Sequence, residues 1–271
     1  MPRAFLLGLC ILFQTFPLAA QQRTAATLSS SDGDLVETDD MVLVGAVVVG
    51  TAALGRVDRA LMLRVQDTAV VERRVLGPIA RRLDFIGRPG SIILGGAAFA
   101  AGKLTGSDRL ADLGLHDATA LLVAEVSTRV LKGVVGRARP DSGGGTFDFR
   151  LGRGWSKERG SFPSGHASSS FAAAAVVTGE MSRWSSPYTV PVGIVMYGGA
   201  AAVGLARIFE NRHWATDVLA GAALGYLIGD NVVEHAYRDA DDETEPAPSS
   251  QGGAASRLPP IPIFYMSIPS R

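Results

Sequence analysis

Residues 161–181, SFPSGHASSSFAAAAVVTGEM, combine two kinds of sequence that together decide the fold. The opening residues include Pro163 and Ser164, which are typical of the chain just before a helix. The remainder is a run of small and apolar residues that is too long for an ordinary strand. The segment therefore predicts a helix capped by Ser164, with small residues that favour close packing against other helices.

Five further apolar stretches of similar composition accompany this one. Turn and helix-boundary residues separate them, such as Arg88-Pro89-Gly90, Arg139-Pro140 and Ser186-Pro187. The six stretches cover residues 41–55, 90–102, 113–131, 167–181, 188–206 and 215–233. We therefore predict an all-α bundle of about six apolar helices, and not a β-sandwich or barrel.

Composition excludes some classes of function. The 271 residues include 26 basic and 26 acidic side chains, so the formal charge is zero and a nucleic-acid partner is not indicated. The apolar fraction of 47% is high enough to exclude disorder as the dominant state. A soluble protein with a large core and a membrane protein both remain.

Membrane spanning is an open question at this stage. A span needs about 20 apolar residues, and several stretches are shorter. The third stretch also carries Asp117, Glu125 and Arg129, which are costly in lipid unless they face inward. The charge-free residues 188–206 are the best spanning candidate.

The N-terminus resembles an export signal. Arg3 precedes an apolar stretch, and small residues suggest cleavage near Ala20, with a retained anchor helix as the alternative. The one cysteine, Cys10, lies within this segment, so the mature chain would have no thiol. The predicted organisation is a signal at 1–20, a polar lead-in at 21–40, a helix and a basic amphipathic segment at 41–89, a helical core at 90–235, and an acidic, Pro/Ser-rich tail at 236–271.

Three short segments carry the candidate chemistry. Lys132 and Arg139 lie at the exit of the third helix and suit a phosphate, although a helix cap and a solvated cation would look the same. Ser164 and Gly165 begin the fourth helix, where free amides bind anions, and His166 adds a proton donor near neutral pH; a simple helix start is the alternative.

The third segment lies between the fifth and sixth helices and contains Arg207, His213 and Asp217. A spacing of four places His213 and Asp217 on one helix face, where the carboxylate can orient the imidazole; a surface hydrogen bond is the alternative. In an alternating bundle all these helix ends lie on one side, so the side chains converge on one pocket. His116 and His235 are predicted to be structural or exposed.

The three segments resemble the motifs of the type 2 phosphatidic acid phosphatase and vanadium haloperoxidase superfamily, over about residues 90–235. Those motifs are Lys-(six residues)-Arg-Pro, Pro-Ser-Gly-His and Ser-Arg-(five residues)-His-(three residues)-Asp. The sequence departs from them at Ala206, where the pattern has Ser.

The resemblance implies a mechanism and a division of roles. His213 would attack phosphorus to form a phosphohistidine, Asp217 would orient it, and His166 would protonate the leaving oxygen and later help to activate water. The phosphoryl oxygens would be held by Lys132, Arg139, Arg207, Ser164 and Gly165. Three cations can replace a metal, so no metal and no other cofactor are expected.

A phosphorylated lipid, of the phosphatidic acid or polyprenyl diphosphate type, is the favoured substrate, and a membrane the favoured partner. A broad periplasmic acid phosphatase, a vanadate-dependent haloperoxidase and a noncatalytic bundle that binds lipid headgroups are the alternatives. The signal predicts export to the cell envelope, with either membrane-associated or soluble periplasmic placement. Cleavage of the signal combined with six membrane spans would leave the site in the cytoplasm, whereas the sites of family members normally face outward. The orientation in the membrane therefore stays open. The sequence does not indicate the oligomeric state.

Overall fold

The computed structural model describes residues 55–63, five single positions between 78 and 87, and residues 90–244. The predicted signal, the lead-in, the first apolar stretch apart from residue 55, and the tail beyond 244 lie outside these residues. Residues 55–63 are helical. The other elements are α3 (Ser91–Thr105), α4 (Asp108–Val135), the short 3-10 helix η3 (Pro140–Ser142), α5 (Gly165–Arg183), α6 (Thr189–Phe209) and α7 (Ala215–Thr244).

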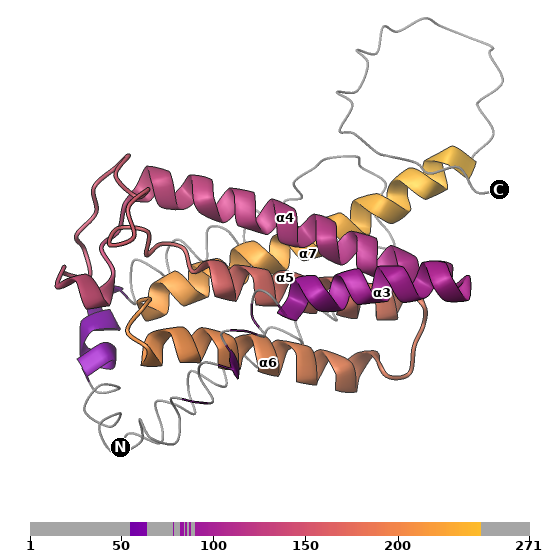
Figure 1. The fold of residues 1–271 in the computed structure, drawn as a ribbon, viewed down its shortest axis with the longest axis horizontal. Helices are drawn as coiled ribbons and strands as arrows, with labels where there is room; N and C mark the ends of the chain where they lie inside the picture. The colour runs from indigo at the N-terminus through magenta and orange to yellow at the C-terminus, as the bar shows by residue number, and fades with distance from the viewer. Residues whose placement is uncertain are drawn as a thin grey trace, which may run out of the picture.

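The all-α prediction is confirmed. Long helices lie side by side in the bundle (Figure 1). Among the described residues, the extended pairing is limited to one isolated antiparallel bridge between Arg137 and Phe149. Most helices extend by up to five residues beyond the predicted apolar stretches, because polar residues such as Asp108 and Arg183 occupy their ends. Helix α7 continues to Thr244, so the predicted boundary between the core and the acidic tail at residues 235–236 is wrong: the first acidic residues of that tail are helical.

Glycine ends α4 and starts the long loop that follows. Gly136 adopts a left-handed backbone with φ of 60°, and its N–H donates to the carbonyl of Lys132. A Cβ at this position would lie 1.9 Å from the Arg150 carbonyl oxygen. The close approach holds loop 136–164 against the end of α4, and this loop later supplies part of the site.

Helices α5 and α7 pack closely because α7 presents a glycine every four residues. Cβ atoms at Gly221, Gly225 and Gly229 would meet the backbone carbonyls of Ser164, Ser168 and Ala172 at 2.3, 2.0 and 2.5 Å. Any larger residue would force the helices apart. The contact starts at the first turn of α5, so it also positions that turn against α7.

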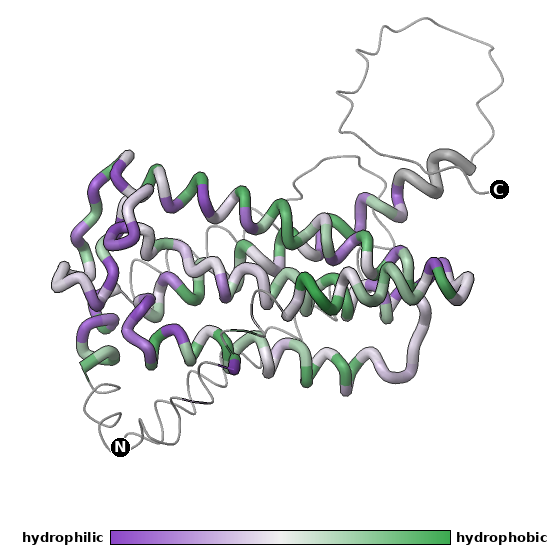
Figure 2. The backbone as a smooth tube through the Cα atoms, viewed as in Figure 1, coloured by the Kyte–Doolittle hydropathy of each residue, from purple (hydrophilic) through white to green (hydrophobic). Residues whose placement is uncertain are grey.

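Large apolar side chains remain exposed along three helices. They include Ile92, Ile93, Leu94 and Leu104 on α3, Leu122, Val126, Val130 and Val134 on α4, and Val190, Ile194 and Val195 on α6. Figure 2 shows hydrophobic residues along the helices and many hydrophilic ones at the bundle end that carries loop 136–164. Among the described residues, Thr189–Phe209 is the helix that is long and apolar enough to cross a membrane, by length and composition, and it coincides with the predicted candidate 188–206.

Candidate phosphate-binding site

The three sequence segments meet at one end of the bundle. This end contains the C-terminus of α4, the N-terminus of α5, the C-terminus of α6 and the N-terminus of α7 (Figure 1). Loop 136–164 and helical residues 55–63 lie at the same end. The alternating direction of the helices therefore brings the candidate residues together as the sequence predicted.

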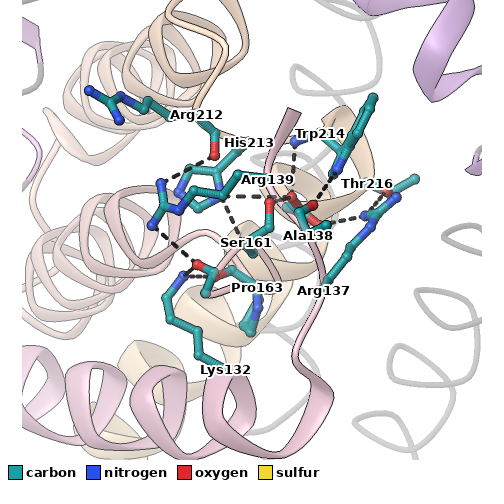
Figure 3. A network of polar contacts seen from close by, with 12 residues as sticks. Lys132, Arg137, Ala138, Arg139, Ser161, Pro163, Arg212, His213, Trp214 and Thr216 are labelled. Atoms are coloured by element: carbon teal, nitrogen blue, oxygen red, sulfur yellow. Dashed lines mark hydrogen bonds and ion pairs between the residues drawn. The ribbon is translucent and has the colours of Figure 1, made fainter. Parts of the chain in front are cut away.

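Lys132 and Arg139 are held by the same part of the loop. The Lys132 Nζ donates to the carbonyls of Gly160 at 2.8 Å and Pro163 at 2.6 Å. The Arg139 Nη2 also donates to Gly160, at 3.2 Å, and its Nη1 to the carbonyl of Arg212 at 3.3 Å (Figure 3). Backbone carbonyls of the same loop therefore orient both cations.

Arg139 retains a donor that suits an anion. Its Nε is buried and has no hydrogen-bond partner within the described part of the chain. Burial lowers the pKa of Arg139, and the nearby cations Arg207 and Arg212 add to this effect against the opposing charge of Asp141. Because an arginine stays charged even so, an anion bound here would relieve both the cation repulsion and the unmet donor.

Ser164 occupies the N-cap position of α5 as predicted, but its side chain makes no capping hydrogen bond. The Oγ is buried and has no partner among the described residues, while the backbone N–H donates to the Asp217 carbonyl at 2.9 Å. Gly165 and the half-buried His166 form the first turn of the helix. An unpaired hydroxyl beside the amides of a helix start is a suitable anion site.

His213 is buried, and one of its ring nitrogens is committed to the backbone. Nδ1 lies 2.7 Å from the Ser161 carbonyl oxygen (Figure 3). A carbonyl only accepts, so Nδ1 carries the proton. Burial lowers the pKa of His213 from 6.5 to about 3, and the charges of Lys132 and Arg139 oppose protonation further. The imidazole is therefore neutral at neutral pH, with its lone pair on Nε2.

His213 and Asp217 lie close together as predicted, but the prediction that they share one helix face is wrong. Helix α7 begins at Ala215, so His213 lies in the turn before it, and the Asp217 Oδ2 is 3.7 Å from Nδ1. The reason is that this Oδ2 accepts from the Trp214 N–H at 2.9 Å, which starts the helix in the manner of a capping box.

Asp217 is instead the centre of a buried network. Its Oδ1 accepts from the Arg137 Nη1 at 2.5 Å, and its Oδ2 from the Ser161 Oγ at 2.5 Å as well as from Trp214. Burial opposes its charge, but these hydrogen bonds, the contact with His213 and the positive charge of Arg137 together keep the pKa of Asp217 below its ordinary value. The carboxylate therefore remains ionised near the imidazole.

Arg207 lies at the end of α6 and is buried, with Nη1 donating to the Glu210 Oε2 at 2.7 Å. Besides burial, the positive charge of Arg207 lowers the pKa of Arg139. Ala206, where the family pattern has Ser, is a buried core residue. Outside the site, His116 contacts the Glu180 Oε1 and His235 contacts the Asn231 carbonyl, as expected of structural histidines.

Sequence reasoning missed four residues of this end of the bundle: Arg137, Ser161, Thr216 and Asp58. Three of them lie within or beside the motifs, where an arginine two residues before Arg139 and a serine three before Ser164 were available signals. Asp58 carried no signal, because it is one acid in a basic segment far away in sequence. Over the described residues, no group of three or more His, Cys, Asp and Glu is placed to hold a metal ion.

The described part of the chain is thus an all-helical bundle that carries, at one end, two buried donors without partners, Arg139 Nε and Ser164 Oγ, and a buried, neutral imidazole, His213. The model of the PAP2 superfamily matches residues 114–235, which include all three segments.

Two similar proteins are informative. A lipid A 1-phosphatase of Porphyromonas gingivalis is 44% identical over 70 residues, which is 26% of this chain and 15% of that protein. The match thus spans a small part of that relative's length. A transmembrane PAP2 type phosphatidylglycerolphosphate phosphatase from Bacillus subtilis is similar in structure, with a TM-score of 0.55 and 21% identity over 77% of this chain and 98% of that one. At this identity the likeness concerns the fold.

Proposed function

We propose that the chain is a metal-independent phosphatase, a phosphoric ester hydrolase that acts on a lipid phosphomonoester or diphosphate through a phosphohistidine. The observation that carries this proposal is the state of His213. Its Nδ1 proton is held by the Ser161 carbonyl, and its low pKa keeps Nε2 unprotonated. A neutral imidazole with a fixed tautomer is a nucleophile, and simple headgroup binding would not need one.

The reaction proceeds in two steps. His213 Nε2 attacks phosphorus, the bond to the leaving oxygen breaks, and His166 gives that oxygen its proton. Water then attacks the phosphohistidine, His166 takes a proton from it, and phosphate leaves as Nε2 regains its lone pair. The cationic ring of the intermediate is stabilised by the ionised Asp217 nearby.

The phosphoryl group is bound by buried donors that have no hydrogen-bond partner in the described structure and by nearby positive charge. The buried Arg139 Nε and Ser164 Oγ lack protein partners in the described structure, and the amide of Gly165 begins a helix. Lys132 supplies further positive charge, and Arg207, whose charge is shared with Glu210, adds to it in part. Phosphoryl transfer needs mainly positioning and stabilisation of negative charge, so we expect activity without a metal.

A lipid substrate is supported by the surface and by the two similar proteins. Apolar side chains are exposed on α3, α4 and α6, and Thr189–Phe209 is long and apolar enough to span. Both similar proteins are named as phosphatases of lipids. We therefore propose that the chain is membrane-associated in the cell envelope and that phosphatidic acid or a polyprenyl diphosphate is the type of substrate.

The test is phosphate release by the purified protein, in chelator, from phosphatidic acid, a polyprenyl diphosphate and a small aryl phosphate. His213→Ala is the test variant and His235→Ala the matched control, because the hydrogen bond of His235 is a local one to the Asn231 carbonyl on α7. We expect release without metal that is lost in His213→Ala and kept in His235→Ala, with lipid substrates preferred.

Different failures have different meanings. Equal activity in His213→Ala removes the proposed nucleophile. A preference for the aryl phosphate indicates a broad phosphatase. Absence of release from every substrate contradicts the proposal, and halide oxidation that depends on added vanadate would then indicate the haloperoxidase branch.

A further inference from the structure

Arg137 is a buried arginine with a full set of hydrogen bonds. Only 2% of the residue is exposed. Nε and Nη2 donate to the Thr146 carbonyl at 3.0 and 2.7 Å, Nη1 to the Thr216 Oγ1 at 2.7 Å and to Asp217, and Nη2 also to the Asp58 Oδ2 at 2.9 Å. The five N–H groups of a guanidinium are thus matched by five interactions, which leaves none for a substrate.

Asp58 lies outside the matched superfamily domain, on the helical residues 55–63. It too is only 2% exposed. Besides accepting from Arg137, it accepts from the backbone N–H of Thr216 at 3.1 Å and from its Oγ1 at 2.5 Å. The Arg137 cation is therefore held between two buried carboxylates, Asp58 and Asp217, and Asp58 also fixes the first turn of α7.

These contacts continue to the proposed nucleophile. Arg137 fixes one oxygen of Asp217, so the other is directed to Ser161 and to the Trp214 N–H. The carbonyl of the same Ser161 accepts the Nδ1 proton of His213. Each step is a hydrogen bond between buried groups, so a shift of Arg137 would alter the orientation of the imidazole.

We propose that Asp58 and Arg137 are positioning residues for the phosphatase reaction, and that the segment containing Asp58 is therefore part of the active site although it lies outside the family domain. The inference rests on the proposed function. Arg137 differs from Arg139, which is held by carbonyls and keeps its charge for an anion. Its task is to orient Asp217 and, through Ser161, His213.

The test compares Asp58→Asn, Arg137→Gln and Arg137→Lys with the wild type on a soluble aryl phosphate. Inorganic phosphate serves as a competitive inhibitor that reports on the anion site. We expect kcat to fall about 10- to 100-fold in Asp58→Asn and Arg137→Gln, because each loses a hydrogen bond to a charged group, while the Ki of phosphate stays unchanged. Arg137→Lys keeps the charge and should recover part of the loss.

Glu180→Gln is the matched control for a merely structural role. Glu180 is fully buried and bonded to His116 and Tyr237 near the opposite ends of the helices. This variant should lose stability and keep kcat per folded molecule. Thermal unfolding of every variant gives the folded fraction.

Several results would overturn the inference. One is a wild-type kcat in Asp58→Asn, which tests the idea even where Arg137→Gln does not fold. Another is a decrease in kcat that is fully explained by a smaller folded fraction, as expected for Glu180→Gln. A third is a decrease in kcat accompanied by an equal increase in the Ki of phosphate. A wild type without phosphatase activity refutes the proposed function together with the inference, whereas an active wild type and an unaffected Asp58→Asn refute the inference alone.

Discussion

The substitution Gly221→Ala tests whether the packing of α7 against α5 positions the residues of the site. Gly221 is buried on α7, and a Cβ there would lie 2.3 Å from the carbonyl oxygen of Ser164, the residue that begins α5. Carbon and carbonyl oxygen normally approach to about 3.3 Å. The difference means that the start of α5 must move by about 1 Å relative to α7.

The expected magnitude combines two opposing terms. Alanine favours a helix over glycine by about 1 kcal/mol, whereas overpacking costs about 1–3 kcal/mol, so the net loss of stability is small. The loss of activity is larger. The Ser164 N–H donates to the Asp217 carbonyl at 2.9 Å, and its hydroxyl belongs to the proposed phosphate site. A displacement of about 1 Å among such groups lowers kcat by about 100-fold.

The assay is turnover of an aryl phosphate beside thermal unfolding in the same detergent. The control is Gly199→Ala, because this glycine lies on the exposed face of α6 and a Cβ there has nothing within 4 Å. We expect Gly199→Ala to be fully active and slightly stabilised. If Gly221→Ala were as active and as stable as the control, the close contact between α5 and α7 would not constrain the site.

Three further predictions concern individual side chains. The pKa of His213 is about 3 in the folded protein, against an ordinary value of 6.5. Its contribution to the free energy of unfolding is therefore complete above pH 6.5 and is lost as the pH falls toward 3. When unfolding free energies from chemical denaturation are plotted against pH, the decrease over this range should be smaller for His213→Gln. Glu180→Gln should lose about 1–3 kcal/mol of unfolding free energy in chemical denaturation, because it weakens buried bonds to His116 and Tyr237. Ser164→Ala removes a hydroxyl that lacks a protein partner, so stability should be unchanged while the Ki of inorganic phosphate rises about tenfold; an unchanged Ki would remove Ser164 from the site.

The convergence of the site could be predicted from sequence because it depends on topology alone. Successive helices of a bundle alternate in direction, so the end of α4, the start of α5, the end of α6 and the start of α7 meet. The position of His213 could not be predicted from its spacing to Asp217. That spacing is compatible with one continuous helix, but Asp217 caps the Trp214 N–H and the helix starts at Ala215. An acid in the first turn of a helix was the available signal.

The different tasks of the arginines could not be predicted from their residue type. Arg137 and Arg139 are two residues apart, and either could bind a phosphate. The structure distinguishes them by their partners: Arg139 is held by carbonyls, whose dipoles orient a cation without removing its charge, whereas Arg137 lies between the carboxylates of Asp58 and Asp217. One of those carboxylates is 79 residues away in sequence, in a segment that resembles a surface helix. A cation whose charge is already balanced gains little from a second anion, so Arg139 is the one suited to the substrate and Arg137 the one suited to holding the site in place.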